Sequence, residues 1–179
     1  MAIGVTMHTF DIQLADVDRS VYEDLSVRVA RHPSETDAFM MTRVLAYCLE
    51  YEEGIEFSRG GLSDPDDPPI AVKDLTGIVK TWIDIGTPAA DRLHRAAKST
   101  PRVAVYSHKE SGQWLAGLKA ARIHKAEDLE LYAIERSLVG ALAAKLDRRM
   151  SFALAVSDRE VFLSFADATL TGKIDRLKL

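Results

Sequence analysis

The segment KTWIDIGTPAADRL, residues 80–93, places an aspartate, Asp84, between two isoleucines, Ile83 and Ile85. A carboxylate that is buried without a partner costs several kcal/mol or is forced into its neutral form. Three explanations are open: Asp84 pairs with an arginine or caps backbone amides, it reaches a cleft, or it holds a metal ion. The first explanation is structural, and the other two would make Asp84 part of a functional site.

The spacing around this aspartate predicts where it lies. Side chains alternate along a strand, so Trp82, Asp84 and Gly86 share one face, while the two isoleucines point to the opposite face and into the core. We expect the strand to end at Gly86 and a helix to follow at once, with Thr87 as its cap and Pro88 at its first position. Ligands bind preferentially at the carboxyl ends of strands in open α/β sheets. We therefore expect Asp84 to face a cleft, with Trp82 forming one wall.

The segment ARHPSET, residues 30–36, leads into the clearest helical pattern of the chain. Ser34 has the character of an N-cap, with Asp37 three residues later as a shortened capping box. Glu35 in a first helical turn would favour the helix dipole. The same segment could instead supply polar groups to a site, through Glu35, Ser34 and His32. Both interpretations are open from the sequence.

The segment FSRGGLSDPDDPP, residues 57–69, predicts an acidic loop. Its carboxylates at Asp64, Asp66 and Asp67 would repel one another unless they are solvated or share a divalent cation. Arg59, at the end of the preceding strand, is a candidate contact for a phosphate or for one of these acids. A solvated surface loop is the alternative interpretation.

Composition limits the classes of protein. The chain has 179 residues with 47% apolar and 28% charged residues, which predicts one globular domain over residues 1–179. The net charge of −4 argues against strong non-specific binding of polyanions but allows a local basic cleft. The single cysteine, Cys48, excludes an internal disulfide, and with no visible signal peptide or membrane span we expect a cytoplasmic protein without membrane contact.

Periodicity predicts an α+β fold, with a mixed sheet and flanking helices. A hairpin of two strands, near residues 4–14 and 25–31, precedes a helix that starts at about residue 34. The core that follows has strands near 55–59, 78–86 and 102–107, and the step over residues 82–105 is a strand–helix–strand unit with parallel strands. Further elements are a short strand at 70–75, helices at 111–121 and 137–146, a strand at 129–134 and terminal strands within 150–177.

Four segments together resemble a known family. ARHPSET, the helix MMTRVLAYCLEYEEG, WIDIGTP and VAVYSH occur in this order and at these distances in the YaeQ family, a bacterial family of about this length. The resemblance covers essentially the whole chain. It implies a variant of the PD-(D/E)XK fold, a restriction-endonuclease-like core with additional N- and C-terminal strands.

In that superfamily, acids on the first helix and on two adjacent strands hold Mg²⁺. The resemblance matches Asp84 to the central acid and Glu35 to the helix acid. The Pro-Asp element falls where this chain has Pro68-Pro69, so that Asp67 is the displaced candidate, with Asp74 as another auxiliary ligand. If Glu35 and Asp84 share one ion, their carboxylates should lie roughly 4–8 Å apart.

The resemblance also implies a lysine on the face of Asp84, two residues later. This chain has Gly86 there, so Lys80, on the same face, is the candidate catalytic replacement, with Lys109 or His108 as alternatives. The candidate substrate-binding residues are Arg59, His32, Ser34 and Trp82.

The expected activity is Mg²⁺-dependent phosphodiester hydrolysis at a cleft around Asp84. The alternative is a catalytically degenerate nuclease fold that binds nucleic acid or a protein partner. A small-molecule pocket at the same strand ends is a third interpretation.

Overall fold

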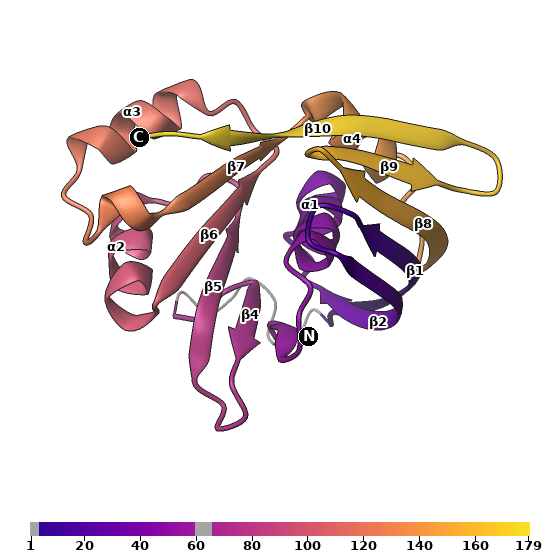
Figure 1. Cartoon of the computed structure of the whole chain (residues 1–179), viewed down its shortest axis with the longest axis horizontal. Helices are drawn as coiled ribbons and strands as arrows, with labels where there is room; N and C mark the ends of the chain where they lie inside the picture. Colours follow the sequence, from indigo (N-terminus) through magenta and orange to yellow (C-terminus); the bar gives the residue numbers. More distant parts are fainter. Residues whose placement is uncertain (1–3, 60–65) are drawn as a thin grey trace.

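A computed structural model describes residues 4–59 and 66–179 of the chain (Figure 1). The strands are β1 (Thr6–Asp16), β2 (Val21–Arg31), β3 (Ile55–Phe57), β4 (Ile70–Lys73), β5 (Val79–Ile85), β6 (Arg102–Ser107), β7 (Glu130–Ile134), β8 (Arg149–Ser157), β9 (Glu160–Ser164) and β10 (Thr169–Leu177). The helices are α1 (Asp37–Leu49), α2 (Ala90–Ser99), α3 (Gly112–Ala120) and α4 (Arg136–Ala143). Among the described helices, none is long and apolar enough to cross a lipid bilayer.

All of the described strands join one mixed sheet in the order β2-β1-β8-β9-β10-β7-β6-β5-β4-β3. The N-terminal hairpin β1–β2 is antiparallel, as predicted, but β1 also pairs in parallel with the distant strand β8. At the other end, β5, β6 and β7 are parallel, and β4 pairs antiparallel with β5. The mixed α+β fold is therefore confirmed, and β5 is an interior strand.

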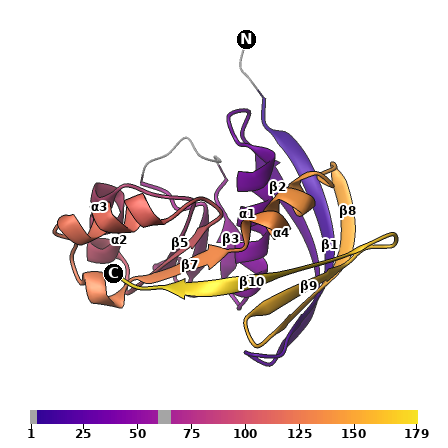
Figure 2. The ribbon, with the colours of Figure 1, turned by 90° about the horizontal axis from the view of Figure 1, so that it is seen from above.

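Strand β10 connects the two halves of this sheet. Its first part, Thr169–Lys173, pairs with β9, and its second part, Ile174–Leu177, pairs with β7. Figure 2 shows β10 running across from one half to the other. At Gly172, a β-carbon would lie 2.6 Å from the β-carbon of Leu138, so the close approach of α4 to this strand excludes a side chain.

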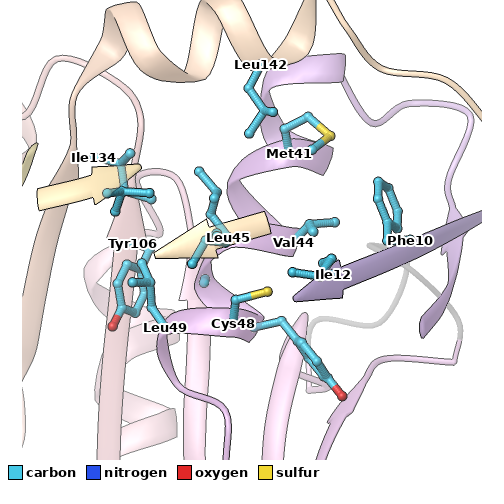
Figure 3. Packing of buried hydrophobic residues seen from close by; sticks show 14 of the residues in the cluster. Phe10, Ile12, Met41, Val44, Leu45, Cys48, Leu49, Tyr106, Ile134 and Leu142 are labelled. Atoms are coloured by element: carbon cyan, nitrogen blue, oxygen red, sulfur yellow. The ribbon is translucent and has the colours of Figure 1, made fainter. Parts of the chain in front are cut away.

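Helix α1 is enclosed on all sides. Every residue from Met40 to Leu49 is buried, including the polar Thr42 and Arg43. In Figure 3, Val44 points toward β1, while Leu45 and Leu49 lie toward the other half of the sheet. The helix is therefore the core around which both halves of the sheet pack.

The alternation predicted for β5 is confirmed. Ile83 and Ile85 belong to the hydrophobic core around α1. Trp82, the residue before Ile83, lies on the opposite face of the strand and belongs to a second, smaller core together with Leu93 of α2 and Leu131 of β7. Strand β5 is thus covered on both faces, as its nearly continuous apolar run requires.

The predicted helix caps are wrong by two residues. The N-cap of α1 is Thr36, whose hydroxyl accepts a hydrogen bond from the backbone N–H of Phe39 at 3.1 Å, whereas Ser34 lies in the preceding turn. The predicted capping box does not form, because the Asp37 carboxylate instead pairs with an arginine of β2. Helix α2 begins at Ala90 with Ala89 at its N-cap, so Thr87 lies in the preceding loop.

Candidate functional site

The carboxylate of Asp84 is buried and held by three donors. The Nε of Arg92 lies 2.6 Å from Oδ2, and the indole N–H of Trp82 donates to the same oxygen at 3.2 Å. The other oxygen accepts the backbone N–H of Ile85 at 3.2 Å. Asp84 is 4% exposed, so an ion pair, rather than solvent, compensates its charge.

Trp82 does not form a cleft wall as predicted. Its ring lies beneath the guanidinium of Arg92, whose Cζ is 5.2 Å from the ring centroid. The indole therefore fixes both partners of the ion pair, one by stacking and one by a hydrogen bond. Arg92 comes from the first turns of α2, which follows β5 directly, so the strand and the helix that succeeds it supply the complete arrangement.

A cleft of about 320 Å³ does open beside this ion pair, at the carboxyl end of β5. Asp67, Asp84, Arg92 and Lys109 bring charged groups to it, and Phe39 of α1 contributes an apolar surface. We call this cavity the Asp84 cleft. It lies at the expected position, and it holds equal numbers of acidic and basic side chains. Both Asp67 and Asp84, which the resemblance gives as metal ligands, line it.

Gly86 shapes this cleft through its backbone. Its φ of +86° lies in the left-handed region, which side-chain-bearing residues rarely adopt. A β-carbon there would contact only Phe39, at 3.9 Å, so conformation rather than space selects glycine. A lysine at position 86 would therefore be strained, and the glycine allows the chain to turn from β5 toward α2.

Lys109, not Lys80, brings a lysine to the Asp84 cleft. Lys80 is exposed near the start of β5, at the opposite end of the strand, and it does not line the cleft. Lys109 follows the end of the neighbouring parallel strand β6. The carboxyl ends of parallel strands meet at one edge of a sheet, which explains how a residue 25 positions from Asp84 reaches the same cavity.

Glu35, the predicted helix acid, forms an ion pair with Arg43 of α1 and not with a group of the Asp84 cleft. It is buried, and its Oε1 lies 2.9 Å from Nε of Arg43, while Nη2 of Arg43 donates to Oε2 at 3.1 Å. Oε2 also accepts the backbone N–H of His32 at 3.1 Å. Burial raises the pKa of Glu35 and lowers that of Arg43, since each charge loses its hydration.

The two acids predicted to share one ion therefore have separate arginine partners. Glu35 does not line the Asp84 cleft. Within residues 4–59 and 66–179, no group of three or more histidine, cysteine, aspartate or glutamate side chains is arranged to hold a metal ion. The chemistry of the remaining set, two carboxylates beside Arg92, does not fit a magnesium site unless the arginine moves away.

The other predicted residues are dispersed. His32 lies at a different cavity, described below, and Ser34 is exposed in the turn beside it. Arg59 is exposed and lines a cavity of about 330 Å³ that shares Asp67 with the Asp84 cleft. Asp74 lies at the tip of the β4–β5 hairpin, where hydrogen bonds from the Thr76 hydroxyl and nearby amides lower its pKa. Asp64 lies outside the described residues.

A third cavity, of about 390 Å³, adjoins the Asp84 cleft through their common residue Lys109. It lies at the ends of β6 and β7 and the start of α4, where Arg136 and Lys173 join Lys109. Among the described side chains, no carboxylate lies within ion-pair distance of these three cations, which are exposed or partly exposed. We call the three joined cavities the strand-end groove.

The groove also contains acids, but their oxygens are partly occupied. Glu135 accepts the backbone N–H of Lys173 at 2.8 Å, and Glu110 accepts that of Gly112 at 3.1 Å. The pKa of His108 is lowered to about 4, first by burial and then by the positive charges of Lys109 and Arg136. Asp175 lines the cavity as well, so three acids and three cations lie at this end of the groove, and no ion pair joins them among the described side chains.

Sequence reasoning missed Arg92, Arg136 and Lys173 as contributors to this edge of the sheet. For Arg92 a usable signal exists, because it lies in the first turns of the helix that follows the β5 carboxylate. For Lys173 no local signal exists, because it reaches the groove only through the pairing of β10 with the two halves of the sheet.

The opposite ends of the same strands carry a closed ionic network. Arg102, at the start of β6, donates to both oxygens of Glu50 and to both oxygens of Glu130 at 2.5–3.1 Å. Tyr106 and Tyr132 add hydroxyl hydrogen bonds of 2.6 and 2.9 Å to these acids. All three guanidinium nitrogens of Arg102 thus donate within the protein, whereas Lys109, Arg136 and Lys173 have no ion pair with a described acid.

Comparison with known proteins gives a consistent assignment. The family model of the YaeQ protein matches residues 1–174. The YaeQ proteins of Escherichia coli (strain K12) and Salmonella typhi are each 28% identical to the chain, over 92% and 93% of its length and 91% and 92% of theirs.

Two crystal structures are also similar to the chain. The YaeQ protein from Pseudomonas syringae aligns with a TM-score of 0.89 and 30% identity, covering 97% of this chain and 96% of that one. The YaeQ protein from Xanthomonas axonopodis pv. citri aligns with a TM-score of 0.87 and 30% identity, covering 96% and 97%. The family model and the agreement in both sequence and fold lead to one conclusion: the chain belongs to the YaeQ family.

Proposed function

We propose that the protein is a catalytically degenerate, nuclease-like module that binds nucleic acid along the strand-end groove. The proposal includes descent of its strand–helix–strand core from a PD-(D/E)XK fold. The observation that carries it is the set of three cations, Lys109, Arg136 and Lys173, which line one cavity without an acidic partner among the described side chains. Lysine and arginine side chains of this kind neutralise backbone phosphates and release counterions.

Degeneracy of the catalytic apparatus is supported by the state of the acids. Asp84 is bound by Arg92 and Trp82, and Glu35 is paired with Arg43 inside the protein. The position of the expected lysine is Gly86, in a backbone conformation unsuited to lysine. Each of these features removes one component of metal-assisted hydrolysis.

A titration of a fluorescently labelled single-stranded oligonucleotide, followed by anisotropy at several salt concentrations, tests this function. The test variant is Lys109→Ala/Arg136→Ala/Lys173→Ala. The matched control, Lys80→Ala/Lys98→Ala/Lys119→Ala, removes the same charge from exposed positions that line none of the three groove cavities.

We expect the test variant to bind more weakly and to lower the slope of log K against log salt by about 2, since each contact with a single strand contributes roughly 0.7. The control should keep the slope of the unmodified protein. Equal slopes for the two variants would contradict nucleic-acid binding at the groove, and the absence of binding at low salt would leave a protein partner as the alternative.

One observation favours magnesium-dependent phosphodiester hydrolysis as a second candidate function. Asp67 and Asp84 line the same cleft together with Lys109, the two acids and one lysine that the resemblance to the PD-(D/E)XK superfamily implies, and Arg92 would have to leave Asp84 before an ion could bind. Calorimetric titration with Mg²⁺ and Mn²⁺ tests it, with Asp67→Asn as the comparison. Saturable heat in the unmodified protein that disappears in the variant would support a metal site, and the absence of heat in both would exclude it.

A further inference from the structure

The largest of the described cavities, about 440 Å³, lies away from the strand-end groove. It is formed at the start of β1, the end of β2 and the segment before β8, and it shares no lining residue with the three cavities of the groove. Arg31 and His32 of the ARHPSET segment line it, together with His8 and Arg148. Neither the proposed function nor the family assignment gives these four side chains a role.

The hydrogen bonds of His32 determine which ring nitrogen carries the proton. Its Nδ1 accepts the backbone N–H of Ser34 at 3.1 Å and lies 2.6 Å from the Ser34 hydroxyl. A nitrogen that accepts from an amide N–H cannot itself carry the proton in that bond. The neutral ring of His32 is therefore protonated at Nε2, which makes that nitrogen a donor.

His8 has the opposite tautomer. Its Nδ1 lies 3.0 Å from the backbone carbonyl oxygen of Asp147, which can only accept, so Nδ1 carries the proton. The ring is 4% exposed, and in its neutral form Nε2 bears a lone pair. The cavity thus combines two imidazoles whose tautomers are fixed by main-chain groups, one presenting a donor and the other an acceptor.

Two guanidinium groups flank these rings. Arg31 uses Nη2 to donate to the carbonyl oxygen of Glu35 at 3.0 Å and to the Asp37 carboxylate at 2.5 Å, which leaves its other nitrogens without a hydrogen bond among the described residues. Arg148 is exposed and has no ion pair with a described acid. Asp147 also lines the cavity, and its Oδ1 accepts the backbone N–H of Arg148 at 2.7 Å.

The buried ion pair of Glu35 explains how the donors are held. The Glu35 carboxylate binds the backbone N–H of His32, and the Glu35 N–H donates to the His32 carbonyl oxygen at 3.0 Å. Arg43 holds Glu35 from inside the protein and donates to the carbonyl oxygen of Ala30 at 2.8 Å. A buried ion pair contributes little net stability compared with apolar packing. We therefore infer that the Glu35–Arg43 pair serves to hold the turn from His32 to Glu35 in place.

We propose that this cavity is a site for the oxyanion of a small molecule, a phosphate or a carboxylate, bound by Arg31, Arg148 and the Nε2–H of His32. Guanidinium groups suit both kinds of oxyanion through paired N–H donors. Glu35 and Arg43 act as positioning residues, because they contact the turn and not the ligand.

The test is an NMR titration of the full-length protein that follows the imidazole signals, with inorganic phosphate in one arm and acetate in the other. We expect saturable shifts of the His32 ring signals, with Nε2 protonated at the start. Shifts with phosphate alone assign the site to phosphate groups, and shifts with both assign it to oxyanions in general. The absence of saturable shifts in both arms overturns the proposal.

Neighbouring arginines provide a matched pair of variants. Arg148→Ala removes a proposed ligand, and Arg149→Ala removes a neighbouring exposed arginine that does not line the cavity. We expect the first to weaken oxyanion binding by about tenfold, in line with the loss of one charge-assisted hydrogen bond, and the second to leave it unchanged. Equal affinity in the two variants would overturn the assignment.

Glu35→Gln tests the positioning role separately. We expect weaker oxyanion binding together with a change in the His32 ring signals before any ligand is added, because the turn loses its charged support. His32→Leu keeps the proposal falsifiable if Glu35→Gln does not fold, since it removes the Nε2–H donor at a partly exposed position. Unchanged affinity in His32→Leu contradicts the site.

Discussion

Two acid–arginine pairs, Glu35–Arg43 and Asp84–Arg92, occupy positions where the sequence suggested metal ligands, and they differ in their surroundings. Both side chains of the first pair are 0% exposed, whereas Arg92 of the second is 22% exposed at the wall of a cleft. The first pair can act only on the protein itself. The second lies at a cleft, where its arginine is accessible to solvent. An acid in an apolar segment is therefore informative about function only when the exposure of its partner is known.

The largest effect expected from this comparison is that of Arg43→Met. The substitution leaves the Glu35 carboxylate buried without its counter-charge, so we expect a loss of about 3–5 kcal/mol in the free energy of unfolding. Urea denaturation measures it. The double variant Glu35→Gln/Arg43→Met should recover part of the loss, because no unpaired charge remains. A loss below about 1 kcal/mol in the single variant would show that the Glu35–Arg43 pair is not fully buried away from solvent.

Asp84→Asn should have a smaller effect, a loss of about 1–3 kcal/mol, since the charge-assisted bond to Arg92 is lost but the arginine can turn toward solvent. Thermal unfolding in metal-free buffer measures it, and Glu35→Gln serves as the fully buried comparison. A neutral or stabilising result would contradict the structural role of the ion pair. It would instead indicate that the Asp84 carboxylate serves to bind a ligand. Thermal unfolding repeated with Mg²⁺ would then show whether that ligand is a metal ion.

His108 extends the comparison to pH. Its pKa in the folded protein is lowered to about 4 by burial first and then by Lys109 and Arg136, below the ordinary value of 6.5. The unfolded chain therefore binds an additional proton between about pH 6.5 and pH 4, and stability falls as the pH decreases through this window. The contribution should be about 1–2 kcal/mol after allowing for solvent screening at this partly exposed ring.

The variant His108→Gln should lose less stability than the unmodified protein when the pH is lowered from 7 to about 4.5, as measured by urea denaturation at each pH. Other groups that titrate in this range are common to both proteins and cancel in the difference. Identical pH dependence in the two proteins would mean that the ring is hydrated and not under the field of the groove cations.

The smallest effect belongs to an exposed pair. Lys145 and Asp167 lie 3.5 Å apart, and the Asp167 side chain is 79% exposed. We expect Asp167→Asn to change the free energy of unfolding by less than about 0.5 kcal/mol. Chemical denaturation at low and high salt measures this change. A loss comparable to that of Asp84→Asn would show that exposure does not determine how much an ion pair contributes to stability.

The local features of the fold were predictable because they depend on periodicity. The two faces of β5 follow from the alternation of Trp82, Ile83, Asp84 and Ile85, and the two isoleucines lie in the core as predicted, whereas Trp82 belongs to a second core that was not predicted. The N-cap of α1 could not be predicted, because Ser34 and Thr36, two hydroxyl residues that lie two positions apart, are equivalent candidates by composition. Only the extended backbone of Thr36 lets its hydroxyl reach the Phe39 N–H.

The candidate site was predictable in position but not in membership. The end of β5 followed from Gly86 and the helix pattern, so the cleft could be anticipated. Arg43 could not be recognised as the partner of Glu35, because the sequence does not show that α1 is enclosed on all sides and buries this arginine. Lys173 reaches the groove through β10, whose pairing with β7 is a long-range contact without a local signal.

The position of β10 has a consequence for synthesis of the chain from its N-terminus. The hairpin β1–β2 can form early, but the free edge of β1 has no partner until β8 emerges from residue 149 onward. The two halves of the sheet gain a common strand only after Thr169. A nascent chain that stalls before residue 169 would therefore present unpaired strand edges on both β9 and β7, which are templates for association with other chains.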